Sequence, residues 1–308
     1  MATLILRAAR AILSAVTLFV VTCVTAVSAA AQAREGVTEP EWSRDGRRLV
    51  FAGGVWPDLD VAVLDTATGE PTRHFASDSA DYMPSWSPDG RRIVFTSTRA
   101  GTHQLFIGTL EGGAVVRLTR DSACSNTEPR WSPTGEWIAF RSDCDGNREI
   151  HVIRADGSVR RRLTSDSTED SEPSWSPNGA RIVFTSYRAG QPEVFTMNAD
   201  GTDQRRLSTT PGAYSRRPEW SPDGAWISFG SNRGGNDDVY VMRTDGSGVR
   251  NVHPHPAREY YSRWSPDGGW LVFTSNREPG EYHGHQFANA IYVIRTDGSG
   301  VRRLYPLE

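Results

Sequence analysis

The stretch PSWSPDG, from Pro84 to Gly90, decides the fold because the chain repeats it. It returns as PSWSPNG from Pro173, and looser copies read PEWSRDG from Pro40, PRWSPTG from Pro129, PEWSPDG from Pro218 and SRWSPDG from Ser262. The six copies place their tryptophans 44 or 45 residues apart, at Trp42, Trp86, Trp131, Trp175, Trp220 and Trp264. A period of this length is typical of propeller blades or of solenoid repeats.

Each repeat predicts four short strands. A segment ending in Trp-Ser comes first, and the Pro-Asp-Gly turn after it supplies a preset φ, a capping carboxylate and a positive φ. Two short, nearly apolar runs follow, such as Arg92–Ser97 and Glu149–Ile153, and read as buried strands. A second turn, ADG or TDG, leads to an arginine-rich segment that suits an exposed sheet edge.

We therefore expect an all-β fold, a six-bladed β-propeller of four-stranded antiparallel blades. The alternative is a solenoid of antiparallel units, which would leave more strand edges exposed. The repeat does not decide whether the ring closes by exchanging a strand. The Trp-Ser-Pro-Asp-Gly residues are interpreted as structural, because six equivalent serines or aspartates cannot all be catalytic.

The N-terminus has the pattern of a secretory signal peptide. Arg7 and Arg10 precede an apolar run over 11–27, and Ala31–Ala33 reads AQA, a small-x-small cleavage motif. We expect residues 1–33 to be removed.

Cleavage there leaves 34–308 as the propeller, with no membrane span and a periplasmic or secreted location. The alternatives are an uncleaved membrane anchor and lipidation at Cys23, although the threonine before that cysteine makes a poor lipobox. The net charge of −3 gives no electrostatic case for nucleic acid, which needs a basic face.

Three stretches carry a family resemblance: PSWSPDGRRIVFTSTR, EPSWSPNGARIVFTSYRAGQPEVFTMNADGTDQRRLS and WSPDGAWISFGSNRGGNDDVYVMRTDGSG. They resemble the repeat of the TolB-like propellers, and the resemblance extends from about Glu39 to Leu304. It implies an exported, usually periplasmic, protein-binding propeller. TolB itself binds peptidoglycan-associated lipoprotein. The expected partner is therefore an envelope protein of that kind, or a cell-wall or glycan ligand, bound by a monomer.

The chain departs from TolB at its N-terminus. TolB carries a separate α/β domain before its propeller, whereas only about Arg34 to Pro40 separate the signal from the first repeat here. Similar repeats also occur in oligogalacturonate lyases and in prolyl peptidases. The peptidases need a hydrolase domain with a Gly-x-Ser-x-Gly motif, which this sequence lacks.

Two cysteines of the third repeat are predicted to form a disulfide. The residue 13 positions after the tryptophan is arginine in four repeats but Cys144 in the third. The hairpin there turns around Thr134 and Gly135, so residues whose numbers sum to 268 or 269 should face each other. Cys124 and Cys144 sum to 268, which places them within disulfide reach. The alternative is a pair of free buried thiols, since two ligands are too few for a metal site.

Four histidines fall on one face of the sixth blade. The links that enter each Trp strand, and the loops between the second and third strands, should share one face, here named the link face. His253 and His255 lie in such a link, and His283 and His285 lie in the long loop that follows. Converging imidazoles suit a divalent transition metal, and the alternative is solvated loop histidines. No other cofactor is expected.

Acidic and aromatic residues of the same links predict a partner-binding rim. The residues assigned to it are Asp81, Tyr82, Glu169, Asp170, Glu172, Tyr214, Tyr260 and Tyr261. A second set of varying residues comes just before each tryptophan, on the innermost strand, and its charged members are Glu41, Arg130, Glu219 and Arg263. Charges between blades are costly unless paired, so we expect these four to pair across the channel mouth.

The sequence favours a binding module over an enzyme, because no catalytic set can be assigned. The alternative is a metal-dependent polysaccharide lyase of the oligogalacturonate type that uses the histidines of the sixth blade. Nearby arginines, such as Arg258 and Arg277, would then stabilise the anionic intermediate. A purely structural accessory subunit is the third possibility.

Overall fold

The computed structural model describes residues 36–55, 57–277 and 290–306. The predicted signal peptide, with Cys23, and the loop histidines His283 and His285 lie outside these residues. No helix occurs in the described parts of the chain, so no described helix is long and apolar enough to cross a membrane.

The described residues form six antiparallel sheets, each made of four consecutive strands. Blade one contains β1 (Gly36–Trp42), β2 (Arg48–Val55), β3 (Asp58–Asp65) and β4 (Pro71–His74). Blade two contains β5 (Asp81–Trp86), β6 (Arg92–Ser97), β7 (Gln104–Thr109) and β8 (Val115–Arg117). Blade three contains β9 (Asn126–Trp131), β10 (Trp137–Ser142), β11 (Glu149–Arg154) and β12 (Arg160–Arg162).

The remaining three blades repeat this order. Blade four contains β13 (Asp170–Trp175), β14 (Arg181–Ser186), β15 (Glu193–Asn198) and β16 (Arg205–Arg206). Blade five contains β17 (Ser215–Trp220), β18 (Trp226–Ser231), β19 (Asp238–Arg243) and β20 (Arg250–Asn251). Blade six contains β21 (Glu259–Trp264), β22 (Trp270–Ser275), β23 (Ala290–Arg295) and β24 (Arg302–Tyr305).

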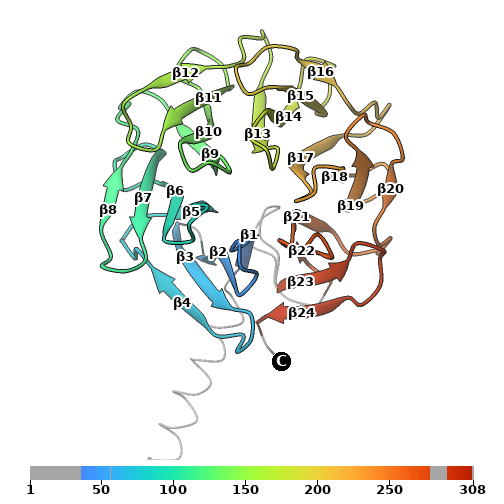
Figure 1. Cartoon of the computed structure of the whole chain (residues 1–308), viewed down its shortest axis with the longest axis horizontal. Helices are drawn as coiled ribbons and strands as arrows, with labels where there is room; N and C mark the ends of the chain where they lie inside the picture. The colour runs from blue at the N-terminus through green and yellow to red at the C-terminus, as the bar shows by residue number, and fades with distance from the viewer. Residues whose placement is uncertain (1–35, 56, 278–289, 307–308) are drawn as a thin grey trace, which may run out of the picture. The chain divides into compact units, whose positions relative to one another are not determined.

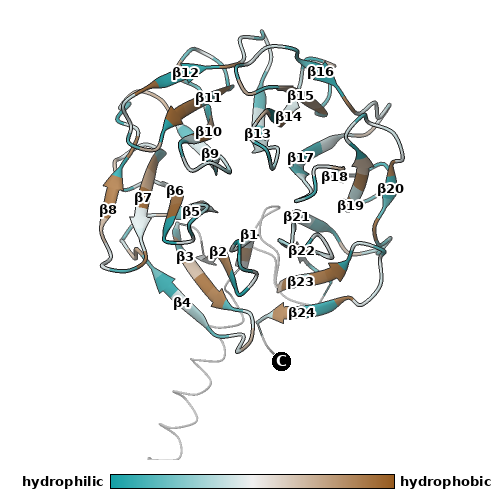
Figure 2. Ribbon diagram, viewed as in Figure 1, coloured by the Kyte–Doolittle hydropathy of each residue, from teal (hydrophilic) through white to brown (hydrophobic). Residues whose placement is uncertain are grey.

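The blades stand in a ring, with the first strand of each nearest the axis and the fourth at the rim (Figure 1). The predicted six-bladed propeller is confirmed. Figure 2 shows apolar residues along third strands such as β3, β11 and β23, and a polar outer strand at β4. The pattern follows from burial, because the middle strands are covered on both faces by neighbouring blades.

A phenylalanine nine residues after each Trp forms the repeated core. These side chains are at most 2% exposed, and they are Phe51, Phe95, Phe140, Phe184, Phe229 and Phe273. Removing such a ring from a packed core typically costs about 3 to 5 kcal/mol. The core is therefore a set of equivalent packing units between blades.

The ring closes by packing and without strand exchange. Blades one and six each consist of their own four consecutive strands. One apolar cluster joins them and includes Phe51 of blade one with Val272, Ile291 and Leu304 of blade six. The ring of Tyr305 lies 5.3 Å from that of Phe51 and extends the same cluster.

The Ser-Pro-Asp-Gly segment is a hydrogen-bonded turn, as predicted. In blade two, the Ser87 hydroxyl donates to Asp89 (2.5 Å) and accepts from the Arg92 backbone N–H (2.9 Å). Asp89 also accepts from the Arg91 N–H (3.0 Å), and Gly90 has a φ of 66° that favours glycine. Each of the six copies places its serine and its Asp, Asn or Thr in this arrangement.

Candidate functional site

Every first strand has a bulge three residues before its tryptophan. The ladder with the second strand shifts register there, for example between Thr38 and Glu41 in blade one. The residue at the bulge has a left-handed φ of 54° to 59° in all six blades: Glu39, Met83, Glu128, Glu172, Arg217 and Tyr261. A bulge redirects a side chain, and here the same redirection occurs six times around one axis.

These six residues, named here the bulge ring, line a hollow of about 710 Å³ around the axis. We call this hollow the funnel. Its wall also contains residues of the link-face loops, among them Arg148, Glu169 and Tyr187. The bulge ring holds three glutamates, one arginine, one tyrosine and one methionine, so its chemistry differs from blade to blade although its backbone does not.

The glutamates of the bulge ring bind neighbouring blades. A carboxylate oxygen of Glu39 accepts from the Met83 N–H (2.6 Å) of the next blade. Glu128 accepts in the same way from Glu172 (2.6 Å), and Glu172 accepts from Arg217 (2.9 Å). Burial raises the pKa of Glu39 to about 7, although Arg130 and Arg217 oppose the shift.

Ion pairs neutralise most of the charge in the funnel. Arg141 lies 2.9 Å from Glu128, and Arg148 lies 2.9 Å from Glu169. Arg217 lies 3.3 Å from Glu172 and stacks 4.1 Å above the ring of Tyr261.

One arginine of the funnel wall is different. Arg216 has no carboxylate within 4.0 Å and no hydrogen-bond acceptor for its guanidinium among the described residues, and it stacks on the Tyr214 ring at 4.7 Å. It is the only one of the three neighbouring arginines Arg148, Arg216 and Arg217 that lacks such a carboxylate in the described chain.

The residues directly before each tryptophan lie deeper in the channel than expected. All of them line a second hollow of about 430 Å³ that opens toward the Ser-Pro turns, and only Arg130 and Arg263 also reach the funnel. Arg263 pairs with Glu219 at 3.0 Å, between adjacent blades.

The other two charged members of this set form no ion pair with described residues. Glu41 instead accepts from the backbone N–H of Trp86 (2.9 Å) and from Ser85 (3.2 Å). The guanidinium of Arg130 donates to the Pro129 carbonyl (2.8 Å). The expected pairing across the channel mouth is therefore wrong for Glu41 and Arg130, because Glu41 accepts from Trp86 and Ser85 and Arg130 donates to a backbone carbonyl.

Four of the eight predicted rim residues line the funnel: Tyr82, Glu169, Glu172 and Tyr261. The hydroxyl of Tyr82 lies 2.6 Å from Nδ1 of His103, so it is held in the wall. Tyr214 and Tyr260 are not among the residues that line the funnel.

Asp81 and Asp170 correct the expectation of an exposed rim. Both side chains are fully buried, and each pairs at 2.6 Å with the arginine of its own blade, Arg99 or Arg188. The reason is local, since the arginine 13 positions after the tryptophan folds back onto the start of the first strand. These aspartates stabilise their blades and offer no surface to a partner.

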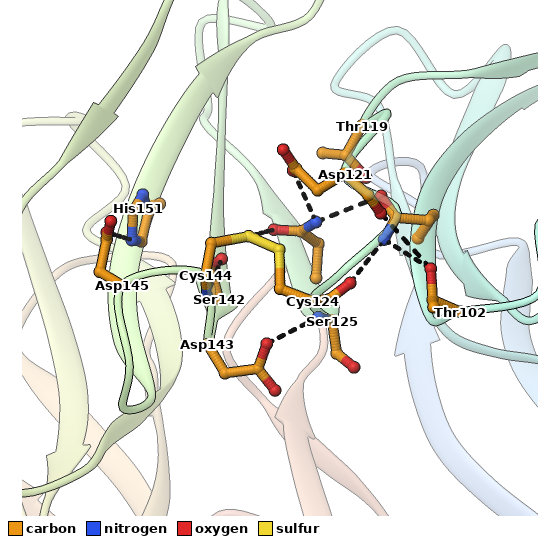
Figure 3. Close-up of a disulfide and its surroundings, with 12 residues drawn as sticks. Thr102, Thr119, Asp121, Cys124, Ser125, Ser142, Asp143, Cys144, Asp145 and His151 are labelled. Carbon is orange, nitrogen blue, oxygen red and sulfur yellow. Dashed lines mark hydrogen bonds and ion pairs between the residues drawn. A yellow bond between two sulfur atoms is a disulfide. The ribbon is translucent and has the colours of Figure 1, made fainter.

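The predicted disulfide between Cys124 and Cys144 is confirmed, with Cα atoms 5.0 Å apart. Figure 3 shows it joining the link before β9 to the loop after β10. Beside it, Asp143 accepts from the Ser125 N–H at 2.6 Å. The disulfide lies next to the start of β9. The bulge of the same strand places Glu128 in the funnel.

Two of the four predicted metal ligands can be examined. The rings of His253 and His255 are nearly parallel, with centroids 5.9 Å apart, and Nδ1 of His255 accepts from the Ala257 N–H at 3.0 Å. Among the described residues, no third histidine, cysteine or carboxylate completes a ligand group with them. His283 and His285 lie outside the described residues.

Sequence comparison supplies the family. The model of the TolB beta propeller domain matches residues 14–128 and 120–227, which is more than half of the chain. The chain belongs to the TolB β-propeller family. No curated protein matches it significantly.

Solved structures of low identity share this propeller fold. One is a putative TolB from Agrobacterium tumefaciens, with 23% identity, a TM-score of 0.71, and coverage of 80% of this chain and 88% of that one. TolB from Acinetobacter baumannii has 20% identity and a TM-score of 0.65, and the match covers 87% of this chain but only 62% of that protein. Oligogalacturonate lyase from Vibrio parahaemolyticus has 14% identity, a TM-score of 0.61, and coverage of 88% and 79%.

Sequence reasoning missed most of the funnel wall. It overlooked Glu39, Met83, Glu128 and Arg217 of the bulge ring, and also Arg141, Arg148, Tyr187 and Arg216. A signal for the bulge ring was present, since the residue three before each tryptophan changes in charge and size while Pro follows it in five of six copies. The recurring proline and tryptophan indicate that the backbone at this position serves the fold. The change of side chain between them indicates another role for that side chain.

Proposed function

We propose that this TolB-family propeller is an exported binding protein that takes a protein of the cell envelope, or another envelope ligand, into the funnel and catalyses no reaction on it. The supporting observation is the contrast between positions. The Trp, Ser, Gly and Phe positions repeat because each blade needs them, whereas the bulge ring around one hollow uses four residue types in six blades. Because the repeated backbone does not demand one residue type at this position, its side chains are available to recognise a ligand.

The chemistry of the wall suits a macromolecular partner. It combines paired arginines and glutamates with Tyr82, Tyr187 and Tyr261, and such aromatic and arginine residues are enriched in interface cores. Its charged pairs favour specificity, because a partner that leaves them unpaired loses affinity.

Site-specific photo-crosslinking tests this proposal. A benzoylphenylalanine replaces Glu169, an exposed funnel residue paired with Arg148, and the purified protein is irradiated in envelope extract of the source organism. The matched control replaces Glu136, an exposed glutamate paired with Arg154 on the opposite face. A specific adduct from Glu169 and none from Glu136 is expected. Equal labelling from both positions, or none from either, would contradict binding at the funnel.

Export is tested separately. The predicted cleavage after Ala33 gives a mature protein that begins at Arg34. N-terminal sequencing of the periplasmic or secreted protein is expected to start there. A protein that retains Met1 in the membrane fraction would instead support an uncleaved anchor.

A metal-dependent lyase is the second candidate, and the close pair of His253 and His255 is the observation in its favour. The described residues supply these two imidazoles and no third ligand, so no reaction step is assigned to a metal. Metal content of the untagged protein, compared with a His253→Ala and His255→Ala variant, decides between the classes. About one equivalent of Mn, Zn or Ni that disappears in the variant would favour the lyase.

A further inference from the structure

The funnel wall has an excess of positive charge where blades four and five meet. Arg216 and Arg217 are adjacent in sequence, and both face the funnel. Glu172 is the carboxylate within 4.0 Å of Arg217, and no described carboxylate comes that close to Arg216. Burial would by itself raise the pKa of Glu172, but Arg217 and Arg216 together hold it below its ordinary value. Two guanidinium groups thus share one carboxylate.

Arg216 has unused donors in a partly dehydrated place. A guanidinium carries five N–H donors, and those of Arg216 bond to no acceptor in the described chain. Its side chain is half-buried against Tyr214, and burial, followed by the neighbouring charge of Arg217, lowers its pKa. Desolvating a cation without an anion is unfavourable, so a bound anion would stabilise this arrangement.

Two other hydrogen-bond donors line the same hollow as Arg216. Tyr187, on the neighbouring blade, lines the same hollow as Arg216, and burial raises the pKa of its hydroxyl, which remains a donor. Arg148, which is exposed and paired with Glu169, also lines this hollow. A planar anion facing Arg216 could accept two parallel N–H bonds, a geometry that carboxylates satisfy.

Arg130 shows why Arg216 is exceptional. Arg130 also lacks an ion pair within 4.0 Å in the described chain, but its charge acts on Glu39, Glu41 and Glu219 in the channel. Its guanidinium also donates to the Pro129 carbonyl at 2.8 Å, whereas that of Arg216 has no acceptor in the described chain.

We propose that Arg216, together with Tyr187 and Arg148, forms a subsite for the side-chain or terminal carboxylate of an acidic peptide segment of the partner protein. The proposal rests on the function proposed above and adds the chemistry of the ligand. A peptide suits the wall better than an acidic glycan. A polyuronate carries a carboxylate on every residue and would meet Glu128, Glu169 and Glu172, whereas a peptide places a carboxylate at one point.

NMR titration at low ionic strength tests the subsite with three probes: acetyl-Glu-Gln-amide, which carries one carboxylate, its uncharged counterpart acetyl-Gln-Gln-amide, and digalacturonate, which carries two. The mature protein is expected to bind the glutamate peptide at least tenfold more tightly than either of the others. Arg216→Gln is expected to weaken glutamate-peptide binding at least tenfold. Arg243→Gln is the matched control, because Arg243 stacks on Trp226 at the opposite face of the same blade and should leave binding unchanged.

Thermal unfolding separates recognition from a structural role. Because Arg216 repels Arg217 and has no carboxylate of its own in the described chain, Arg216→Gln is expected to leave Tm unchanged or to raise it. A fall in Tm with unchanged peptide affinity would overturn the proposal. Tighter binding of digalacturonate than of the peptide, or equal affinity for the glutamate and glutamine peptides, would overturn it as well.

The two proposals fail in different ways. A crosslinked envelope protein at position 169, combined with no preference for the glutamate peptide, would leave the binding function standing and overturn only the carboxylate subsite. Selective peptide binding that Arg216→Gln removes, without any crosslinked partner, would support the subsite and contradict the proposed protein-binding function.

Discussion

A single backbone position, three residues before each tryptophan, brings one side chain of every blade to the same hollow. Its left-handed φ redirects the side chain from the sheet toward the axis in all six blades. Non-glycine residues adopt this conformation only at a cost, so the surrounding bulge, and in five blades the following proline, must hold it. Glu39, Glu128 and Glu172 repay part of the cost by accepting a backbone N–H from the next blade.

Glu39 makes stability depend on pH. Burial raises its folded-state pKa to about 7, above the ordinary value of 4.5, so the folded state binds the proton more tightly than the unfolded state. The stabilisation from this proton is present below pH 4.5 and is lost as the pH rises to 7. Neighbouring Arg130, Arg217 and Glu128 also act on this carboxyl group.

Glu39→Gln should remove this contribution, because a neutral amide can still accept from the Met83 N–H. Between pH 5 and pH 8 the wild-type protein is expected to lose about 2 kcal/mol of unfolding free energy relative to the variant. Urea unfolding at several pH values measures the difference. A difference that stays constant over this range would show that Glu39 does not titrate there.

At the scale of the element, blade three keeps a guanidinium against its core phenylalanine, although the arginine that supplies this group comes from another strand. In blade two, Arg99 lies 5.4 Å from the Phe95 ring and bonds to Ser97 at 3.0 Å. Blade three has Cys144 at that position, and Arg160 of the outer strand takes over. Arg160 lies 5.2 Å from the ring of the core phenylalanine and 2.7 Å from the equivalent serine.

The disulfide of blade three fastens the same end of the sheet. Cys124 and Cys144 are separated by 20 residues, and closing a loop of that length in the unfolded chain stabilises the fold by about 3 kcal/mol. The double variant Cys124→Ser, Cys144→Ser is expected to lose that amount in denaturant unfolding. Dithiothreitol should lower the wild type to the same level and leave the variant unchanged. If dithiothreitol does not change the unfolding free energy of the wild-type protein, the disulfide is contradicted.

At the scale of the whole molecule, the closing interface resembles the other interfaces between blades. Each blade contains four consecutive strands, and the seam between blades six and one is held by apolar packing around Phe51 and Leu304. The other links, from the outer strand of one blade to the inner strand of the next, contain six to eight residues. The seam between blades six and one is therefore held by packing, whereas a chain link also joins the blades at the other interfaces.

A circular permutant should accordingly fold. A linker of about eight residues between Tyr305 and Gly36 matches the other links, and new ends are opened between Thr209 and Ala213, in the link that enters blade five. The permutant is expected to keep the crosslinking pattern of the funnel and to unfold within about 1 kcal/mol of the parent. A permutant that aggregates or loses its far-ultraviolet circular dichroism would show that the original seam is special.

The sequence by itself determined the six blades, the four strands of each, the hydrogen-bonded turn and the disulfide. These features depend on residues close in sequence and on regular antiparallel pairing. The repeat therefore predicts the blades and turns, and the register of one hairpin predicts the disulfide.

Only the tertiary structure decided which variable residues line the funnel. A bulge reverses the face of a side chain, and six bulges meet only after the blades close around an axis. Asp81 and Asp170 do not belong to the exposed rim that the sequence predicted, because arginines from the facing loops cover them. The lack of a carboxylate beside Arg216 in the described chain is also a tertiary feature. It depends on which side chains blades three, four and five bring to that part of the wall.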